Sequence, residues 1–359
     1  MKFGLISLGA TSAQWIVEKA KNYFDSAEHL NLKEIGIKIT RDGKQVFYQN
    51  KPLEDYHCLY LRGSWRYELL RKGIADIIYP NTYTPLHPEA YSNCHNKFLT
   101  ALALQNENVP VPETYFAATT SIAREIIKDI KYPIILKVPK GTQGKGVLFA
   151  DSYSSAKTLL DALEAFNQKY LIQEFIDAGN CDIRAIVAGD KVIAAMKRVA
   201  CKGEMRANIH QGGKGIPIEL DEQTKNLAIK AAKAVGADIC GVDILEGTRP
   251  VVLEVNSSPG IKGITEATGI DVADKIAKYL YDRSFQYTKD KENKGFSGIM
   301  NELETTNELV SNLSVKLGII KLPELVTRLT SFKDEDEVII KGEKGKIEIL
   351  KSDFKKKGR

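Results

Sequence analysis

Asp243, Glu254 and Asn256 have the residue types and spacing that point most directly to chemistry. They interrupt two apolar runs, GVDIL and VVLEVN, which otherwise have the composition of buried strands. Residues two apart on a strand share a face, so Glu254 and Asn256 would project together, roughly 6.6 Å apart. Mg²⁺ commonly binds one or two carboxylates together with the phosphate oxygens of a substrate. The pattern predicts a site for a divalent cation and a polyphosphate, although Asp243 and Glu254 could instead form ion pairs at a sheet end.

A second candidate is the glycine-rich segment that follows Lys137, within PIILKVPKGTQGKGVLFA. Its glycines would let backbone N–H groups approach phosphate oxygens, and Lys137 would add positive charge at the base of the loop. The spacing is not that of a P-loop, and a strand is expected where a P-loop has a helix. The loop does not follow the first strand and open a helix, so it is not a dinucleotide fingerprint. We expect a flap over a polyphosphate; the alternative is an ordinary hairpin turn.

Further polar residues lie within apolar or glycine-containing segments. Glu174, in the strand-like run LIQEFI, could bind ribose hydroxyls or could simply face solvent at a strand end. The hairpin pattern CDIRAIVAGDKVIAAMKR carries Asp182 and Arg184 among apolar residues. The segment MRANIHQGG places Arg206 and Asn208 before a Gly-Gly pair, and the forked donors of arginine suit carboxylates and phosphates.

Alternating strands and amphipathic helices would position these residues. The expected strands span 2–8, 34–40, 45–49, 58–64, 134–138, 147–150, 170–175, 182–188, 191–197, 239–245 and 251–256. The expected helices span 12–24, 93–108, 121–130, 154–167, 222–235 and 271–281. Residues 81–88 and 286–298 are expected to be linkers, and 200–217 a loop. Nearer the C-terminus, the pattern predicts helices at 299–317 and 323–331 and a hairpin around Gly342–Gly345.

The 359 residues carry a formal charge of +5, with 43% apolar and 27% charged residues. This composition is typical of a globular protein of two or three domains. The charge suits anionic ligands but is not extreme enough to favour nucleic acid as a partner. No apolar run reaches the roughly 18 residues of a membrane-spanning helix, so no membrane partner is expected. Five scattered cysteines without a CxxC pair argue against a disulfide framework and zinc fingers and favour the reducing cytoplasm.

Taken together and in order, these segments resemble the ATP-grasp superfamily, in particular the RimK-type α-L-glutamate ligases. The resemblance covers about residues 1–284 and is strongest over 93–270. Its motifs are Asn96-Lys97, Lys137 followed by GTQGKGV, QEFI at 173–176, CDIRAIVAGDKVIAAMKR, RANIHQGG, GVDIL, and LEVNSSPG followed by GIKGIT.

The resemblance implies an α/β ATP-grasp fold. A Rossmann-like pre-ATP-grasp domain would span 1–92, and the ATP-grasp domain 93–284. The latter would consist of an ATP lobe at about 93–176 and a metal and substrate lobe at about 177–284. A linker at 285–298 would lead to a small C-terminal α+β extension at 299–359, to which the sequence assigns no role.

The resemblance also implies roles for individual residues. ATP would be bound by Lys97, Lys137, Gly141, Thr142, Gln143, Gly144, Lys145, Gly146, Glu174, Phe175, Asp182, Arg206, Ala207 and Asn208. Two Mg²⁺ or Mn²⁺ ions would be held by Asp243, Glu254 and Asn256. Arg184, Arg206 and Asn208 would stabilise charge during catalysis.

The implied reaction joins a carboxylate to an amine through an acyl-phosphate and releases ADP and phosphate. Glutamate would be added to an acidic protein tail, peptide or cofactor, and Arg62, at the end of an expected strand, is predicted to contact this acceptor. Gln211 stands where the family often has a basic residue, which points to a different acceptor. The alternatives are a ligase of the glutathione-synthetase, dipeptide-ligase or lysine-carrier-protein type, and a non-catalytic nucleotide-binding regulator. The C-terminal extension could serve homo-oligomerisation.

Overall fold

The computed structural model describes residues 1–141, 146–200 and 214–303, with side chains up to residue 291. Nearer the C-terminus it describes residues 314–316, 319–322, 326, 330, 333 and 336–351. The chain forms two compact units, Met1–Gln286 and Tyr287–Arg359. Among the described residues, no helix combines the length and apolar character needed to cross a membrane.

The N-terminal part of the first unit is built on a parallel sheet of order β2-β1-β6, formed by Ser26–Asn31, Lys2–Ser7 and Cys58–Leu61. The middle strand β1 is apolar, and Phe3, Leu5 and Ile6 are fully buried. Helix α1 (Thr11–Ala20) packs against this sheet through Ala13 and Ile16, which alternate with polar residues at helical spacing. This α/β arrangement was expected, but strand β2 was not, because its sequence SAEHLN has little apolar character.

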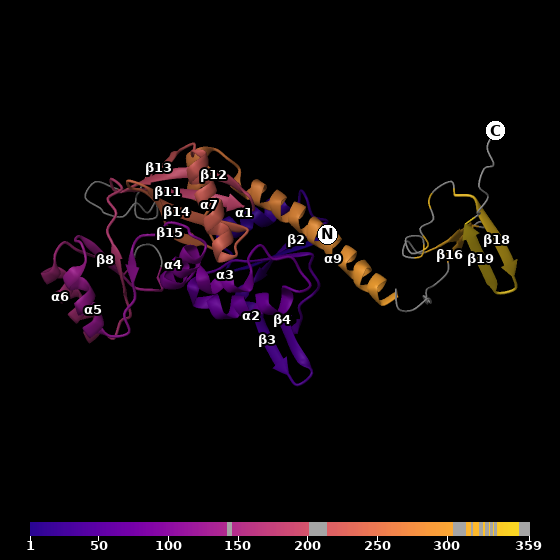
Figure 1. Cartoon of the computed structure of the whole chain (residues 1–359), viewed down its shortest axis with the longest axis horizontal. Helices are drawn as coiled ribbons and strands as arrows, with labels where there is room; N and C mark the ends of the chain where they lie inside the picture. The colour runs from indigo at the N-terminus through magenta and orange to yellow at the C-terminus, as the bar shows by residue number, and fades with distance from the viewer. Residues whose placement is uncertain are drawn as a thin grey trace. The chain divides into compact units, whose positions relative to one another are not determined.

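An antiparallel sheet of β3 (Ile35–Thr40), β4 (Gly43–Tyr48) and β5 (Lys51–Pro52) projects from this region (Figure 1). Helix α2 (Glu68–Ile78), which the sequence analysis missed, packs against β3 and β4. Short helix α3 (Pro88–Asn93) and helix α4 (Lys97–Asn106) replace the single helix expected at 93–108. The break occurs because Asn96 caps α4: its side chain accepts hydrogen bonds from the N–H groups of Phe98 and Leu99.

A second sheet, antiparallel, has the order β7-β10-β8-β9. Its strands are Thr114–Tyr115, Leu171–Glu174, Ile134–Lys137 and Val147–Ala150. Helices α5 (Thr120–Asp129) and α6 (Tyr153–Ala165) cover it and share its core with Ile134, Leu136 and Ile172. The period-two burial of β8 leaves Ile134 and Leu136 in the core and Lys137 at the strand end, as the sequence predicts.

The third sheet is antiparallel and has the order β13-β12-β11-β14-β15. Its strands are Lys214–Pro217, Lys191–Val199, Cys181–Ala188, Ile239–Glu246 and Pro250–Asn256. Helix α7 (Glu222–Val235) lies across it (Figure 1), beginning after the cap Asp221 and ending at Gly236 with a left-handed φ of 77°. The expectation of a loop throughout 200–217 is wrong for 214–217, which pair with β12 as strand β13.

Helix α8 (Lys262–Thr268) follows, and helix α9 runs from Val272 to Leu303, well beyond the expected end at residue 281. The segment 286–298, predicted from its composition to be a linker, is therefore helical. Its lysines, Gln286 and Glu292 have good helix propensity, but Gly295, Gly298 and other residues of lower propensity offset them, so composition alone did not reveal that the helix continues.

In the second unit, β16 (Ser314–Lys316) pairs with β17 (Ile319–Lys321), and β18 (Val338–Glu343) pairs with β19 (Lys346–Lys351). The helix expected at 299–317 is wrong at 314–316, which form a strand, while 304–313 lie outside the described residues. Most of the helix expected at 323–331 also lies outside them. The hairpin predicted around Gly342–Gly345 is confirmed, because β18 and β19 meet at a turn after Glu343.

Candidate active site

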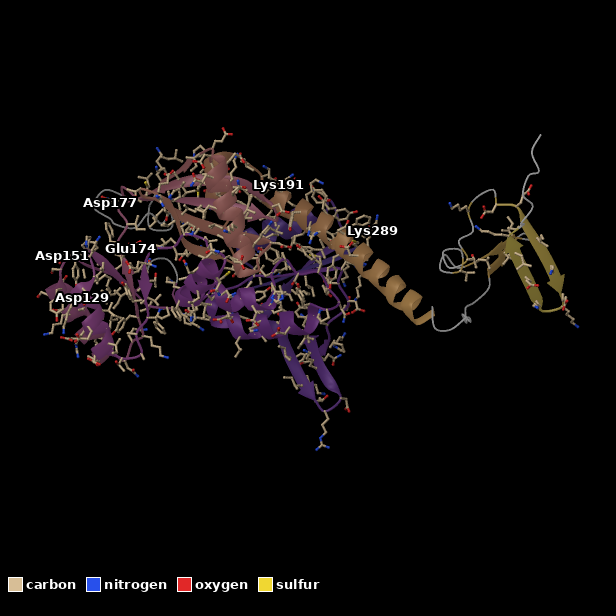
Figure 2. All side chains as sticks on the ribbon, viewed as in Figure 1. Asp129, Asp151, Glu174, Asp177, Lys191 and Lys289 are labelled. Atoms are coloured by element: carbon tan, nitrogen blue, oxygen red, sulfur yellow. The ribbon has the colours of Figure 1, made fainter. Side chains whose placement is uncertain are left out.

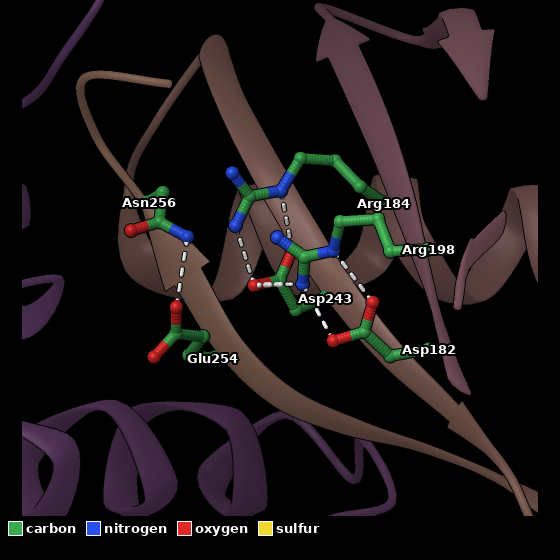
Figure 3. Close-up of polar contacts among 6 residues, drawn as sticks. All are labelled: Asp182, Arg184, Arg198, Asp243, Glu254 and Asn256. Carbon is green, nitrogen blue, oxygen red and sulfur yellow. Dashed lines mark hydrogen bonds and ion pairs between the residues drawn. The ribbon is translucent and has the colours of Figure 1, made fainter. Parts of the chain in front are cut away.

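Asp243, Glu254 and Asn256 come together at one end of the β14–β15 pair. Asp243 lies directly opposite Glu254 in the register, and Gly241 lies opposite Asn256. Glu254 and Asn256 share a face, and the side-chain amide of Asn256 donates a hydrogen bond to Oε1 of Glu254 at 3.0 Å (Figure 3). Asp243 is only 2% exposed. The spacing in the sequence thus brings three oxygen-bearing side chains to one place.

The Asp243 carboxylate is held by two arginines from neighbouring strands (Figure 3). Arg184 donates from Nε to Oδ1 at 2.7 Å and from Nη2 to Oδ2 at 2.5 Å. Nη2 of Arg198 lies 2.9 Å from Oδ2. Burial raises the pKa of Asp243, but the two guanidinium groups outweigh it and hold the pKa below its ordinary value. The ion-paired arrangement considered from the sequence is therefore present for Asp243.

Arg198 also donates two hydrogen bonds, both at 2.6 Å, to the carboxylate of Asp182. The antiparallel register explains the contact, because Asp182 lies opposite Arg198 and Arg184 lies opposite Met196 on one side and Asp243 on the other. Burial raises the pKa of Asp182, and the nearby charge of Asp243 adds to the effect. No role was expected for Arg198 from the sequence, because its neighbours are determined by strand pairing.

Lys137 lies at the end of β8, partly buried, and donates to Oε1 of Gln173 at 2.5 Å. The amide of Gln173 in turn donates to the hydroxyl of Thr114 at 2.8 Å. Burial lowers the pKa of Lys137 to about 8, while the negative charge of Glu254 opposes this shift. The second and third sheets therefore face each other here, with a lysine on one and a carboxylate on the other. Gln173 and Thr114, which orient Lys137, were not identified from the sequence.

The base of the glycine-rich loop is closed by backbone contacts. The N–H of Val138 donates to the carbonyl of Gly146 at 3.0 Å, and the N–H of Lys97 donates to that of Pro139 at 3.0 Å. The Lys97 ammonium group lies 3.3 Å from the carbonyl of Gly141. Lys97 and Lys137 thus lie at two sides of the loop base. The predicted flap residues Thr142, Gln143, Gly144 and Lys145 lie outside the described residues.

Glu174 and Phe175 follow Gln173 at the end of β10 (Figure 2 labels Glu174). The N–H of Glu174 donates to the carbonyl of Glu113 at 2.9 Å, and its side chain is partly exposed. The ring of Phe175 makes an edge-to-face contact with Phe149 of β9, with 5.4 Å between centroids. The predicted site residues Arg206, Ala207 and Asn208 lie outside the described residues.

The residues that follow strand β6 contact the segment that follows Asn256. Arg62, predicted to contact an acceptor, is 5% exposed and donates to the carbonyl of Pro259 at 2.5 Å and to the Tyr60 hydroxyl at 3.2 Å. The N–H of Gly63 donates to the Ser258 hydroxyl at 3.1 Å. Arg62 thus links strand β6 to the segment after Asn256, and its guanidinium group is mostly inaccessible to an acceptor.

A buried polar chain lies beside this contact. Arg71 is fully buried and lies 2.6 Å from Nε2 of His95, which is 3.4 Å from the Ser257 hydroxyl. Burial and the charge of Arg71 lower the pKa of His95 to about 3. His95 is therefore neutral at physiological pH and accepts the hydrogen bond from Arg71.

The donor set at the β14–β15 end suits a hard divalent cation. Two carboxylates and an amide oxygen match the preference of Mg²⁺ and Mn²⁺ for oxygen ligands. Oδ1 of Asp243 accepts one contact from a guanidinium group and Oδ2 accepts two, so a cation bound to this carboxylate would lie directly beside two positive charges. Within the described residues there is no cluster of three or more histidine, cysteine or acidic side chains that would suit a metal.

Comparison with known proteins identifies the family. The family model of the RimK-like ATP-grasp domain matches residues 94–280. The chain belongs to the RimK-like ATP-grasp family. A probable alpha-L-glutamate ligase of Trichodesmium erythraeum (strain IMS101) is 37% identical over 248 residues, which are 68% of this chain and 83% of the relative. One of Marinomonas sp. (strain MWYL1) is 32% identical over 301 residues, 82% of this chain and 100% of the relative.

Solved structures confirm the ATP-grasp fold. The ligase PsnB, in complex with its minimal precursor, aligns with a TM-score of 0.61 and 20% identity, covering 78% of this chain and 97% of PsnB. A RimK domain protein from Sphaerobacter thermophilus DSM 20745 aligns with a TM-score of 0.60 and 19% identity, covering 78% and 99%. As a RimK-like ATP-grasp protein, the chain is an ATP-binding ligase that forms amide bonds.

Proposed function

We propose that this RimK-like ligase adds glutamate to an acidic acceptor, through an acyl-phosphate and with release of ADP and phosphate. The observation that carries the proposal is the approach of Lys137 on one sheet to Glu254 on the other, close enough for their charges to interact. A phosphate group bound between them would meet an ammonium donor on one side and the cation ligands on the other. The names of the relatives support glutamate as the amino acid.

In this proposal the second sheet binds ATP. Lys137 and Lys97 contact its phosphates from the base of the loop, and Gly141 to Gly146 cover them. Glu174 lies at the ribose and Phe175 at the adenine, with Asp182 nearby. Arg206, Ala207 and Asn208, which lie outside the described residues, would also contact the phosphates. Lysine and arginine donors of this kind offset the charge of the transferring phosphoryl group.

Asp243, Glu254 and Asn256 would hold two Mg²⁺ or Mn²⁺ ions in the loaded enzyme. Such ions neutralise charge on the β- and γ-phosphates during transfer. PsnB, a ligase of similar fold, has been solved with Mg and ADP, which supports magnesium as the ion. Lys137, held by Gln173, would orient the phosphates, and the side-chain amide of Asn256 would hold Glu254 in position.

The proposed reaction has two steps. A carboxylate oxygen of the acceptor attacks the γ-phosphorus, and the bond to the bridging oxygen of ADP breaks. The amine of glutamate then attacks the acyl carbon, loses a proton and displaces phosphate. No covalent enzyme intermediate is required, because alignment and charge neutralisation are the main demands of phosphoryl transfer. Arg184, Arg206 and Asn208 would stabilise the negative charge that develops.

Incubation of the protein with ATP, Mg²⁺, glutamate and cell extract tests this proposal. We expect release of ADP and phosphate and a mass increase of one glutamate residue on the acceptor. Glu254→Gln should lower turnover by at least a hundredfold, because a proposed cation ligand loses its charge, while the circular dichroism spectrum stays unchanged. Formation of AMP and pyrophosphate, or normal turnover of the Glu254→Gln variant, would refute the proposed chemistry.

A second candidate acceptor is a ribosomally made peptide. PsnB was solved with a precursor peptide and a RiPP-associated ligase with a leader and core peptide, which supports a peptide as one acceptor to test. Mass spectrometry of the product separates a modified peptide from a dipeptide or a modified cofactor. ATP turnover that depends on an acceptor would also exclude a non-catalytic nucleotide-binding regulator.

A further inference from the structure

The two arginines that hold Asp243 differ in how firmly they are anchored (Figure 3). Arg198 is bound through both Nε and Nη2 to Asp182, and its side chain is 5% exposed. Arg184 has Asp243 as its one ion-pair partner among the residues that the structure describes, and its side chain is 15% exposed. Arg184 can therefore move away from the group by breaking its two hydrogen bonds to Asp243 alone, whereas Arg198 would also have to break its two hydrogen bonds to Asp182.

The four side chains form an electrically neutral group, since Arg184 and Arg198 balance Asp182 and Asp243. A divalent cation on Asp243 would add two positive charges beside two guanidinium groups, of which Glu254 offsets one. In a buried site such an imbalance is strongly unfavourable. The phosphates of a nucleotide would restore the balance and offer Arg184 new oxygen acceptors, which its forked donors suit.

We propose that Arg184 competes with the divalent cation for Asp243, and that it moves to an anionic oxygen of the nucleotide or acyl-phosphate when the cation binds. Arg184 thereby couples cation binding to nucleotide binding: the cation binds Asp243 weakly until an anion is available to accept the guanidinium group. This inference rests on the proposed role of Asp243 as a cation ligand. It adds a second state of Arg184, in which the ion pair of the free enzyme is broken.

A Mn²⁺ titration of the protein without nucleotide tests the inference, with free Mn²⁺ measured by electron paramagnetic resonance. We expect Arg184→Gln to bind Mn²⁺ about tenfold more tightly than the wild type, because the competing cation is gone. We also expect ADP to raise Mn²⁺ affinity less in this variant than in the wild type. Arg184→Lys, which retains charge but not the two-pronged contact, should lie between the two proteins.

Lys197→Gln is the matched control. Lys197 precedes Arg198 on β12, points to the opposite face and pairs with Glu246 at 2.9 Å. The Lys197→Gln substitution therefore removes a nearby positive charge without changing any contact of Asp243. Its Mn²⁺ affinity should equal that of the wild type. Equal or weaker Mn²⁺ binding by folded Arg184→Gln and Arg184→Lys would overturn the inference, as would a tenfold gain in the Lys197 variant.

The titration and the turnover assay separate this inference from the proposed function. If Mn²⁺ binding changes as expected but glutamate and ATP give no ADP, the ligase reaction is wrong and the competition for Asp243 stands. If turnover requires Glu254 but Arg184→Gln leaves Mn²⁺ binding unaltered, the competition is wrong and the reaction stands.

Discussion

Lys137 is the residue in which burial and proposed function are most directly linked. The ammonium group of Lys137 donates a hydrogen bond to Gln173 and interacts electrostatically with Glu254. Burial nevertheless lowers the pKa of Lys137 to about 8. A lysine with a lowered pKa loses its charge as the pH rises through that value. The strength of phosphate binding should therefore depend on pH in a range where an exposed lysine stays charged.

We expect ADP affinity in the presence of Mg²⁺ to fall roughly tenfold between pH 7 and pH 9, because the charged fraction of Lys137 falls by that factor. Isothermal titration calorimetry at several pH values measures this. Lys137→Arg should abolish the dependence, since a guanidinium group stays charged across the range. Lys140→Met, which removes a half-exposed lysine paired with Glu68, should retain it. A flat profile in the wild type would show that Lys137 remains charged above pH 9.

Most candidate site residues could be identified from the sequence, but the side chains that hydrogen-bond to them could not. The spacing of Glu254 and Asn256 was sufficient to place them on one face, because strand periodicity is local, whereas Asp243 joins them through the pairing of β14 with β15. The contacts of Asp243 with Arg184 and Arg198 depend on which strands pair and in which register, and nothing in a single sequence specifies that. The same limit hid Gln173 as the partner of Lys137.

Among the structural elements, the hairpin formed by β8 and β9 bears most directly on the proposed nucleotide site. It is closed at Gly146, which has a φ of 77°, and a Cβ atom there would lie 2.4 Å from a methyl carbon of Val138. Both the backbone conformation and the space therefore require glycine at this position. The end of β8 that carries Lys137 depends on this closure.

Gly146→Ala should destabilise the hairpin locally by about 1–3 kcal/mol, which is typical of a non-glycine residue forced into the left-handed region. We expect KM for ATP to rise at least fivefold, with little change in Tm, since the core between this sheet and helices α5 and α6 is unaffected. Gly342→Ala, at a position with open space and an ordinary φ, is the control and should leave both quantities unchanged. An unaltered KM in Gly146→Ala would show that the flap tolerates the displacement.

Helices and strands with a regular spacing of apolar residues were predicted well. Those whose formation depends on neighbouring parts of the fold were not. Helix α7, with its Asp221 cap and terminal Gly236, agrees with its predicted bounds. Strand β2 has a weak apolar pattern and forms because β1 supplies a parallel partner. Helix α9 extends through the polar segment 286–298, although Gly295, Gly298 and the polar composition suggest a linker.

At the scale of the whole molecule, the chain divides after Gln286. The match to the RimK-like ATP-grasp domain, at 94–280, lies entirely in the first unit, as do all the residues proposed to bind ATP and cations. The Marinomonas relative is matched over its full length by 82% of this chain. We therefore expect the amide-forming chemistry to require only what the first unit contains.

A variant that ends after Leu303 tests this division and keeps α9 intact. We expect its ADP release with ATP, Mg²⁺ and glutamate to stay within about twofold of the full chain when a small acidic peptide is the acceptor, because a domain with its own core folds and acts alone. The same comparison with acceptors from cell extract measures the contribution of residues 304–359, the part of the second unit that this variant lacks. If selectivity among acceptors changes while the basal rate stays, the second unit serves recognition. If the basal rate is lost although circular dichroism shows a folded protein, the second unit takes part in the reaction, and the assignment of the whole site to Met1–Gln286 is wrong.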